Sequence, residues 1–477
     1  MTRCVSRIRT PSFGATGPRW CVLALLAALA GCNLGPDFKR PDVTVPDTWR
    51  ERLDAQGPSW PSANWWHGFG STELDGYIDQ ARRSNTDLAA AIARVREADA
   101  LATVAGAALL PNIGASATAL SERTQATSSQ YENFRQYSPQ LTASYVIDFW
   151  GKNRAAQAAA IAAATASRHD RATVEITVMT SVALTYFQSV ELRERLSVAH
   201  RNLISAQTIL RGLRLQLQAG IATALDVAQQ ETTVSTLDAA IPPLEQQLRQ
   251  AVHALAVLTG QTPESVDTPT VALTDLALPV VRPGLPSELL ARRPDVAQAQ
   301  DQLVAANANI AVARASFFPN IELTASGGYA SSALSTLLQS SSAVHALTAS
   351  IVQPIFDGGV LKGQYAYATA RYDELVAAYR KAVLSALSDV EDSLVAVQQT
   401  AEQVQRQETA VAKARRAYEI ALAQLHSGTI SILTVLNTET ALFSAQDALV
   451  QAKFSQMQAL VGLYSALGGG WQPGPGA

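Results

Sequence analysis

The chain has 477 residues, of which 48% are apolar and 16% charged, so it can form several ordered domains and is not a disordered tail protein. The formal net charge is −3. Four of the 37 basic residues fall in the first 31 positions, so the rest of the chain is more acidic still and nucleic acid is disfavoured as a partner. Alanine is abundant and aromatic residues make up only 6%, which suits helices packed at close range.

Residues 1–31 have the plan of a bacterial export signal peptide. They carry four arginines and no acid, followed by an apolar run from Cys21 to Ala30 that is too short for a permanent membrane helix. We therefore expect the chain to leave the cytoplasm.

The sequence Leu29-Ala30-Gly31-Cys32 resembles the bacterial lipobox, in which the chain is cut between Gly31 and Cys32 and the thiol of Cys32 carries lipid. Cys32 is the only cysteine beyond the signal, so a disulfide within the mature chain is excluded. Asn33 stands where an aspartate retains lipoproteins at the inner membrane of enteric bacteria, which favours delivery to the outer membrane. The alternative is an ordinary cleavage site with a leftover cysteine.

The sequence contains an internal repeat of one unit, with a constant offset of 208 residues between the two copies. The offset does not drift between the anchors, so loop lengths inside the unit are fixed as well. The matched pairs are Asp87 with Asp295, Pro111 with Pro319, Gly220 with Gly428, Glu231 with Glu439, and Gly260 with Gly468.

Each copy is expected to open with an Ala-rich helical stretch, over 72–110 and 287–318. These stretches end at the helix-to-strand junctions Pro111 and Pro319, because proline cannot continue the backbone ladder of a helix.

Strands are predicted after each junction, at about 113–122 and 137–149 in the first copy and about 321–330 and 345–356 in the second. From 137 to 149, apolar residues hold the odd positions and polar residues most of the even ones, over a length that suits a tilted membrane strand. The polar stretches 123–135 and 331–342 are expected to be external loops. The same strands could form a soluble sandwich with one wet face, and only the helices around them favour the membrane.

Very long proline-free helices are predicted over 152–218 and 360–427, with apolar residues spaced alternately three and four apart. Gly220 and Gly428 should end them in tight turns, after which the apolar seam resumes in an antiparallel helix. Pro242-Pro243 should interrupt the first return helix, and the second has no counterpart.

The predicted strands require several protomers. No stretch beyond the signal offers about 18 uninterrupted apolar residues, so any membrane-spanning part must be a closed β-barrel. Two hairpins supply four strands, whereas the smallest single-chain barrels have about eight. Unpaired edge groups in lipid would cost several kcal/mol each, so neighbouring copies must complete the wall.

Six segments in a fixed order carry a resemblance to a known family: Gly35 to Pro41, Trp65-Trp66, Arg292 to Val296, Phe318 to Ile321, Phe356 to Gly359 and Leu467 to Trp471. With them the chain resembles the outer-membrane efflux protein family, the TolC-like outer membrane factors, and most closely its lipoprotein branch.

The resemblance implies a mainly α fold with a small transmembrane part. A homotrimer forms a 12-stranded β-barrel, four strands per chain, continued by a long periplasmic coiled-coil barrel of helices. The implied parts are the signal peptide 1–31, a lipid-anchored extension 32–70, repeat 1 over 71–270, repeat 2 over 285–470 and a tail 471–477.

The resemblance also implies a function and partners. The chain is expected to be the passive exit duct of a tripartite efflux pump in the outer membrane, conducting drugs, toxic compounds or metal ions. A periplasmic adaptor protein and an inner-membrane RND-type transporter are its expected partners, and outer-membrane lipid surrounds it. The alternatives are the outer-membrane component of a type I polypeptide secretion system and a structural periplasmic coiled-coil lipoprotein.

The family often narrows the periplasmic tip with a leucine and, four residues later, an aspartate. Leu433 matches the leucine, whereas Asn437 stands at the acid position and Thr434 where some members carry a second acid. The first turn has Leu225 and Asp226. We expect an apolar constriction at Leu433 with a weaker charge ring from Asp226, the alternative being that Leu225 and Leu433 are ordinary seam residues.

Enzyme signatures do not form a set. The six histidines are scattered without the spacing of metal ligands, and no nucleophile elbow or phosphate loop occurs. We expect no catalytic residue, no metal and no cofactor.

Overall fold

The computed structural model describes residues 35–51, 60–127 and 130–472. The expected cleavage and lipidation site at Gly31 and Cys32 lies outside these described residues. The chain divides into two compact units. The described parts of the first unit are 35–39, 98–127, 130–163 and 302–375, and those of the second are 40–51, 60–97, 164–301 and 376–472.

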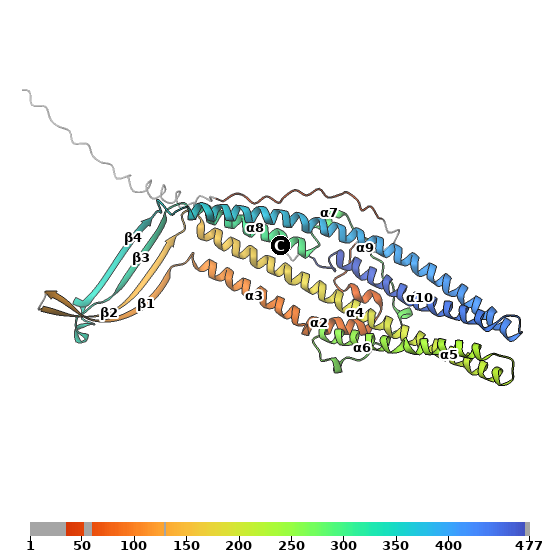
Figure 1. Cartoon of the computed structure of the whole chain (residues 1–477). Helices are drawn as coiled ribbons and strands as arrows, with labels where there is room; N and C mark the ends of the chain where they lie inside the picture. The colour runs from red at the N-terminus through yellow and green to blue at the C-terminus, as the bar shows by residue number, and fades with distance from the viewer. Residues whose placement is uncertain (1–34, 52–59, 128–129, 473–477) are drawn as a thin grey trace, which may run out of the picture. The chain divides into compact units, whose positions relative to one another are not determined.

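The first unit contains a four-stranded antiparallel sheet in the order β1-β2-β3-β4 (Figure 1). The strands are β1 (Asn112–Thr127), β2 (Gln130–Ile147), β3 (Asn320–Tyr329) and β4 (Ala343–Val352). Strands β2 and β3 belong to different sequence repeats, and they pair from Gln140 with Gly328 to Ile147 with Ile321. The two hairpins therefore form one sheet.

The first hairpin is longer than the sequence predicted. Residues 123–135, expected to be an external loop, lie mostly within β1 and β2, and the ladder continues to the pair Thr127 and Gln130. Strand pairing uses backbone groups, so polar side chains do not end it. In the second copy, 331–342 contains only the short turns η4 (Leu334–Thr336) and η5 (Ser340–Ser342), and β4 ends two residues before Pro354.

The second unit is helical. Its N-terminal part has η1 (Trp65–Phe69), α2 (Thr72–Ser84) and the start of α3 (Thr86–Ala107). The single helix expected over 72–110 is thus broken at Asn85, whose side chain caps α3 by accepting a hydrogen bond from the Leu88 amide at 3.0 Å. The stretch predicted over 287–318 is likewise divided into α7 (Pro286–Leu289) and α8 (Pro294–Ala315).

The long helices and their return helices follow the prediction closely. α4 (Lys152–Gln218) and α9 (Val360–His426) each have 67 residues. The first return is divided into α5 (Ala224–Ala239) and α6 (Ile241–Leu258), with prolines in the first turn of α6. The second return, α10 (Ile432–Ala466), is continuous. The short turns η2 (Pro263–Ser265) and η3 (Leu273–Asp275) lie between the two repeats.

Aromatic side chains fill much of the core of the second unit. Trp66, Phe69 and Phe187 are almost fully buried, and the rings of Phe69 and Phe187 lie 4.9 Å apart. Tyr186 is buried beside them, and its hydroxyl contacts Ser71 Oγ at 2.8 Å. Burial raises the pKa of Tyr186, so it stays neutral and acts as a structural hydrogen-bonding group.

None of the helices in the described ranges combines the length and the hydropathy that a bilayer-spanning helix needs.

Candidate functional site

The strand register places apolar side chains on one face of the sheet. Odd-numbered residues pair with odd-numbered residues across all four strands up to the pair Gln125 and Tyr131, as in the row Ile113, Ala143, Ala325 and Leu347. The even-numbered residues form the opposite, more polar face. Ile113 is 73% exposed and Leu347 is 82% exposed, so the apolar face is uncovered within the described chain. A face of this kind needs lipid or another apolar surface against it.

The sheet is open in the single chain. Among the described residues, β1 pairs only with β2, and β4 pairs only with β3. The outer edges of β1 and β4 therefore offer unpaired backbone groups to a further strand.

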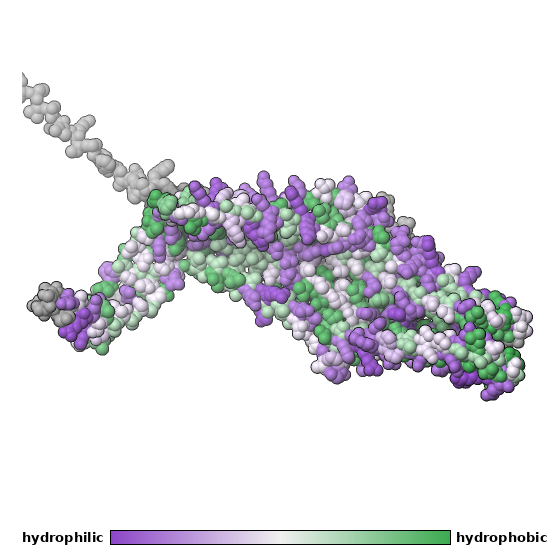
Figure 2. Space-filling model, viewed as in Figure 1, coloured by the Kyte–Doolittle hydropathy of each residue, from purple (hydrophilic) through white to green (hydrophobic). Residues whose placement is uncertain are grey.

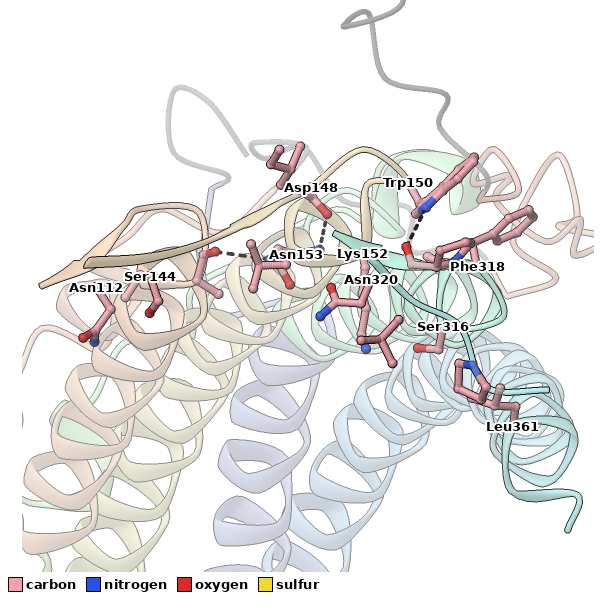
Figure 3. A pocket seen from close by; sticks show the side chains of 18 of the residues that line it. Asn112, Ser144, Asp148, Trp150, Lys152, Asn153, Ser316, Phe318, Asn320 and Leu361 are labelled. Atoms are coloured by element: carbon pink, nitrogen blue, oxygen red, sulfur yellow. Dashed lines mark hydrogen bonds between the residues drawn. The ribbon is translucent and has the colours of Figure 1, made fainter. Parts of the chain in front are cut away.

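A cavity of about 850 Å³ lies in the first unit, where the strands meet the ends of helices (Figure 3). Asp148 accepts hydrogen bonds from the backbone amides of Asn153 and Arg154, both at 2.9 Å, and so caps α4. The indole nitrogen of Trp150 donates to the Pro319 carbonyl at 2.9 Å, which ties the start of α4 to the start of β3. Pro111 lies directly before β1 and Pro319 directly before β3.

The two turns after the long helices are built alike. Gly220 has φ +73° and Gly428 has φ +72°, the left-handed region in which a side chain is strained. The amide of Ile221 donates to the Gln216 carbonyl at 2.8 Å, and that of Thr429 donates to the Gln424 carbonyl at 3.0 Å. Both are Schellman-type helix ends. The predicted repeat thus extends to single hydrogen bonds.

The leucines after these turns point away from the helix seam. Leu225 is 64% exposed and Leu433 is 50% exposed, whereas Val227 and Val435, two residues further along, are buried. In Figure 2, apolar atoms gather at the end of the second unit where the turns lie. Within the described part of the chain, neither Leu225 nor Leu433 is among the buried side chains of the cluster between the hairpins.

The polar residues expected near the tip differ in their contacts. Asp226 forms a capping box with Thr223, whose backbone amide donates to the Asp226 carboxylate at 2.8 Å. This carboxylate is therefore held at the start of its own helix. Thr434 and Asn437 are exposed.

The two helical hairpins pack against each other near their turns. The shared apolar cluster takes Leu210, Leu213 and Val227 from the first hairpin and Ala421, Ile432, Val435 and Leu436 from the second. The side chains predicted for the seam of the long helices, such as Leu210 and Ala421, are buried in this cluster.

Sequence reasoning missed a polar group at this interface. Glu439 of α10 and Gln230 of α5 are both 0% exposed. Burial raises the pKa of Glu439 to about 7, against a lowering effect of Gln230 and Ser205. A signal was present, because Glu439 falls four residues after Val435 and three before Leu442, on the apolar seam.

Among the described residues, no group of three or more His, Cys, Asp and Glu side chains is arranged to hold a metal ion.

The fold corresponds to that of solved outer-membrane channels. The chain is similar to the MtrE outer membrane channel of Neisseria gonorrhoeae, solved in its open state, with a TM-score of 0.85 and 29% identity over 92% of this chain and 99% of that chain. A four-stranded sheet with an uncovered apolar face, followed in each repeat by a long helical hairpin, defines a TolC-like outer-membrane channel protein.

A family profile described as outer membrane efflux protein matches residues 77–261 and 285–469, two ranges whose ends keep the offset of 208 residues. The chain is 39% identical to the pyoverdine export outer membrane protein OpmQ of Pseudomonas putida, over 95% of this chain and 97% of that protein. It is 33% identical to the toluene efflux pump outer membrane protein TtgF of the same species, over 94% and 96%. The chain belongs to the outer membrane efflux protein family, and it is an efflux channel protein of the outer membrane.

Proposed function

We propose that three copies of this chain close one twelve-stranded barrel in the outer membrane and continue as a helical duct in the periplasm. The uncovered apolar face and the open edges of the sheet carry this proposal, because a lone four-stranded sheet leaves backbone groups unpaired in lipid. Pairing between copies satisfies these groups at every edge.

The duct is one part of a tripartite pump. A periplasmic adaptor protein and an inner-membrane RND-type transporter complete the path, and the transporter supplies the energy. The exposed apolar residues near the turns, among them Ile221 and Leu225, offer a surface at which such a partner can act. Leu225 and Leu433 narrow the duct at this end.

The test is the assembly and conductance of the full-length protein. In mild detergent it should migrate as one species with the mass of three protomers, and in a planar bilayer it should conduct ions. A stable monomer would contradict the shared barrel, and a trimer that never conducts would contradict the duct.

Cys32 anchors the chain through lipid in this proposal, because the lipobox precedes a cysteine that has no disulfide partner in the mature chain. Labelling with radioactive palmitate should be lost in Cys32→Ala and retained in Cys21→Ala. Equal labelling of both variants would contradict the lipid anchor at Cys32.

A further inference from the structure

Glu439 is an acid enclosed by the two helical hairpins of the second unit. Its neighbours come one from each of the other three helices: Ser205 of α4, Gln230 of α5 and Tyr418 of α9. The hydroxyls of Ser205 and Tyr418 lie 3.3 Å apart, and the amide nitrogen of Gln230 donates to the Ala206 carbonyl at 2.9 Å. These four side chains form a polar cluster that joins the two hairpins.

The cluster has more buried acceptor atoms than hydrogen bonds that satisfy them. Both carboxyl oxygens of Glu439 and the amide oxygen of Gln230 are buried without a partner among the described residues. All three atoms are acceptors when Glu439 is ionised. A proton on Glu439 removes the buried charge and supplies a donor, and both effects favour the packed state.

No cation compensates the carboxylate. Among the described residues, Glu439 has no ion-pair partner, and Tyr418 is the one titratable group among its three neighbours. Arg214 of α4 and Glu231 of α5 pair with each other at 2.8 Å, and neither forms an ion pair with Glu439. A buried carboxylate without a partner is destabilising.

We propose, on the basis of the proposed duct, that Glu439 acts as a proton-operated latch. When Glu439 is protonated, it holds the hairpin α4–α5 against the hairpin α9–α10. When it is ionised, it loosens this interface near the tip. The direction of the pH dependence follows from burial, which raises the pKa of Glu439 to about 7. The neutral form prevails at lower pH, so the hairpins stay packed there. As the pH rises towards about 7, the carboxyl group of Glu439 ionises, and the state in which the two hairpins are separated becomes more populated.

The internal repeat provides a matched control. Glu231 is the counterpart of Glu439 at the offset of 208 residues, but its carboxylate is exposed and paired with Arg214. The two acids at equivalent positions of the repeat therefore differ in burial and in having an ion-pair partner, and the latch requires a buried acid without such a partner.

The experiment records single-channel currents of the full-length trimer in planar bilayers from pH 5.5 to 8.5. The wild-type open probability should rise from pH 5.5 to about 7 and level off above it, and the ratio of open to closed states should change by on the order of 10- to 100-fold. Glu439→Gln, which keeps the shape and stays neutral, should remain at the low-pH level throughout. Glu231→Gln should keep the wild-type step. A step that persists unchanged in Glu439→Gln, or a wild type without a step, overturns the latch.

A second measurement does not depend on conductance. Thermal unfolding of Glu439→Gln should occur at a higher temperature than that of the wild type at pH 8, and at nearly the same temperature at pH 5.5. An equal shift at both pH values would show a packing effect and overturn the latch. Loss of conductance at every pH, with the unfolding result as expected, would instead refute the duct while leaving the proton-dependent interface in place.

Discussion

Single glycines end the two longest helices of the molecule. Gly220 and Gly428 have positive φ angles, and an added Cβ at either position would meet no atom within 4 Å. A side chain would therefore be excluded by backbone conformation alone, not by crowding. The same residue type at both turns follows from the same local geometry.

We expect Gly428→Ala to lower the stability of the hairpin by about 1 to 2 kcal/mol, because alanine is strained in the left-handed region. Gly212→Ala is the control, since Gly212 lies within α4 with no atom within 4 Å of an added Cβ. Alanine there should raise stability by about 0.5 to 1 kcal/mol. Thermal unfolding in detergent measures both, and shifts of the same sign would refute the conformational explanation.

We expect the exposed leucines at the tip, Leu225 and Leu433, to affect conductance and not folding. We expect Leu433→Ala, and more strongly the double variant with Leu225→Ala, to raise single-channel conductance, because removal of apolar side chains widens and wets a constriction. Leu384→Ala is the control, as Leu384 is 58% exposed in the middle part of α9. Unchanged conductance in the double variant would place the constriction elsewhere.

At the scale of elements, the two return helices begin differently. Thr223 caps α5 through a capping box with Asp226, whereas Ser431 precedes α10 without a side-chain cap hydrogen bond. The first return helix is also divided before its prolines, and the second is continuous. Equivalent positions in the repeat therefore differ in how much of their stability is local.

Thr223→Ala should destabilise the first turn of α5 by about 1 kcal/mol, because the amide of Asp226 loses its acceptor. Amide hydrogen exchange of this turn measures the effect. Ser431→Ala should leave exchange in the first turn of α10 nearly unchanged. Equal acceleration in both helices would show that capping does not distinguish them.

At the scale of the whole molecule, the relatives are named for different exported compounds. OpmQ of Pseudomonas putida is named for pyoverdine export, and TtgF for toluene efflux. The chain is 39% identical to OpmQ and 33% identical to TtgF.

Expression in a Pseudomonas putida strain that lacks OpmQ tests the substrate. Restored pyoverdine in the medium would assign this chain to the class of OpmQ. Pyoverdine export by the Cys32→Ala and Leu433→Ala variants should be compared with export by the wild type at matched amounts of protein in the outer membrane. Toluene tolerance in a strain without TtgF is the opposing test, and restored tolerance without pyoverdine export would assign the chain to the other class.

The sequence alone determined the features that are set by local patterns. The repeat offset, the 67-residue helices, the turn glycines and the alternation of the strands each depend on residues close together in the chain. The family followed from short segments in a fixed order.

Only the tertiary structure decided which side chains are enclosed. It extended the first hairpin through a polar stretch, because a neighbouring strand satisfies backbone groups whatever the side chains are. It left Leu433 exposed and buried Glu439, although both lie within the first eight residues of α10, because burial depends on which helix lies opposite. The contacts between hairpins join residues some 200 positions apart, and no local pattern encodes them.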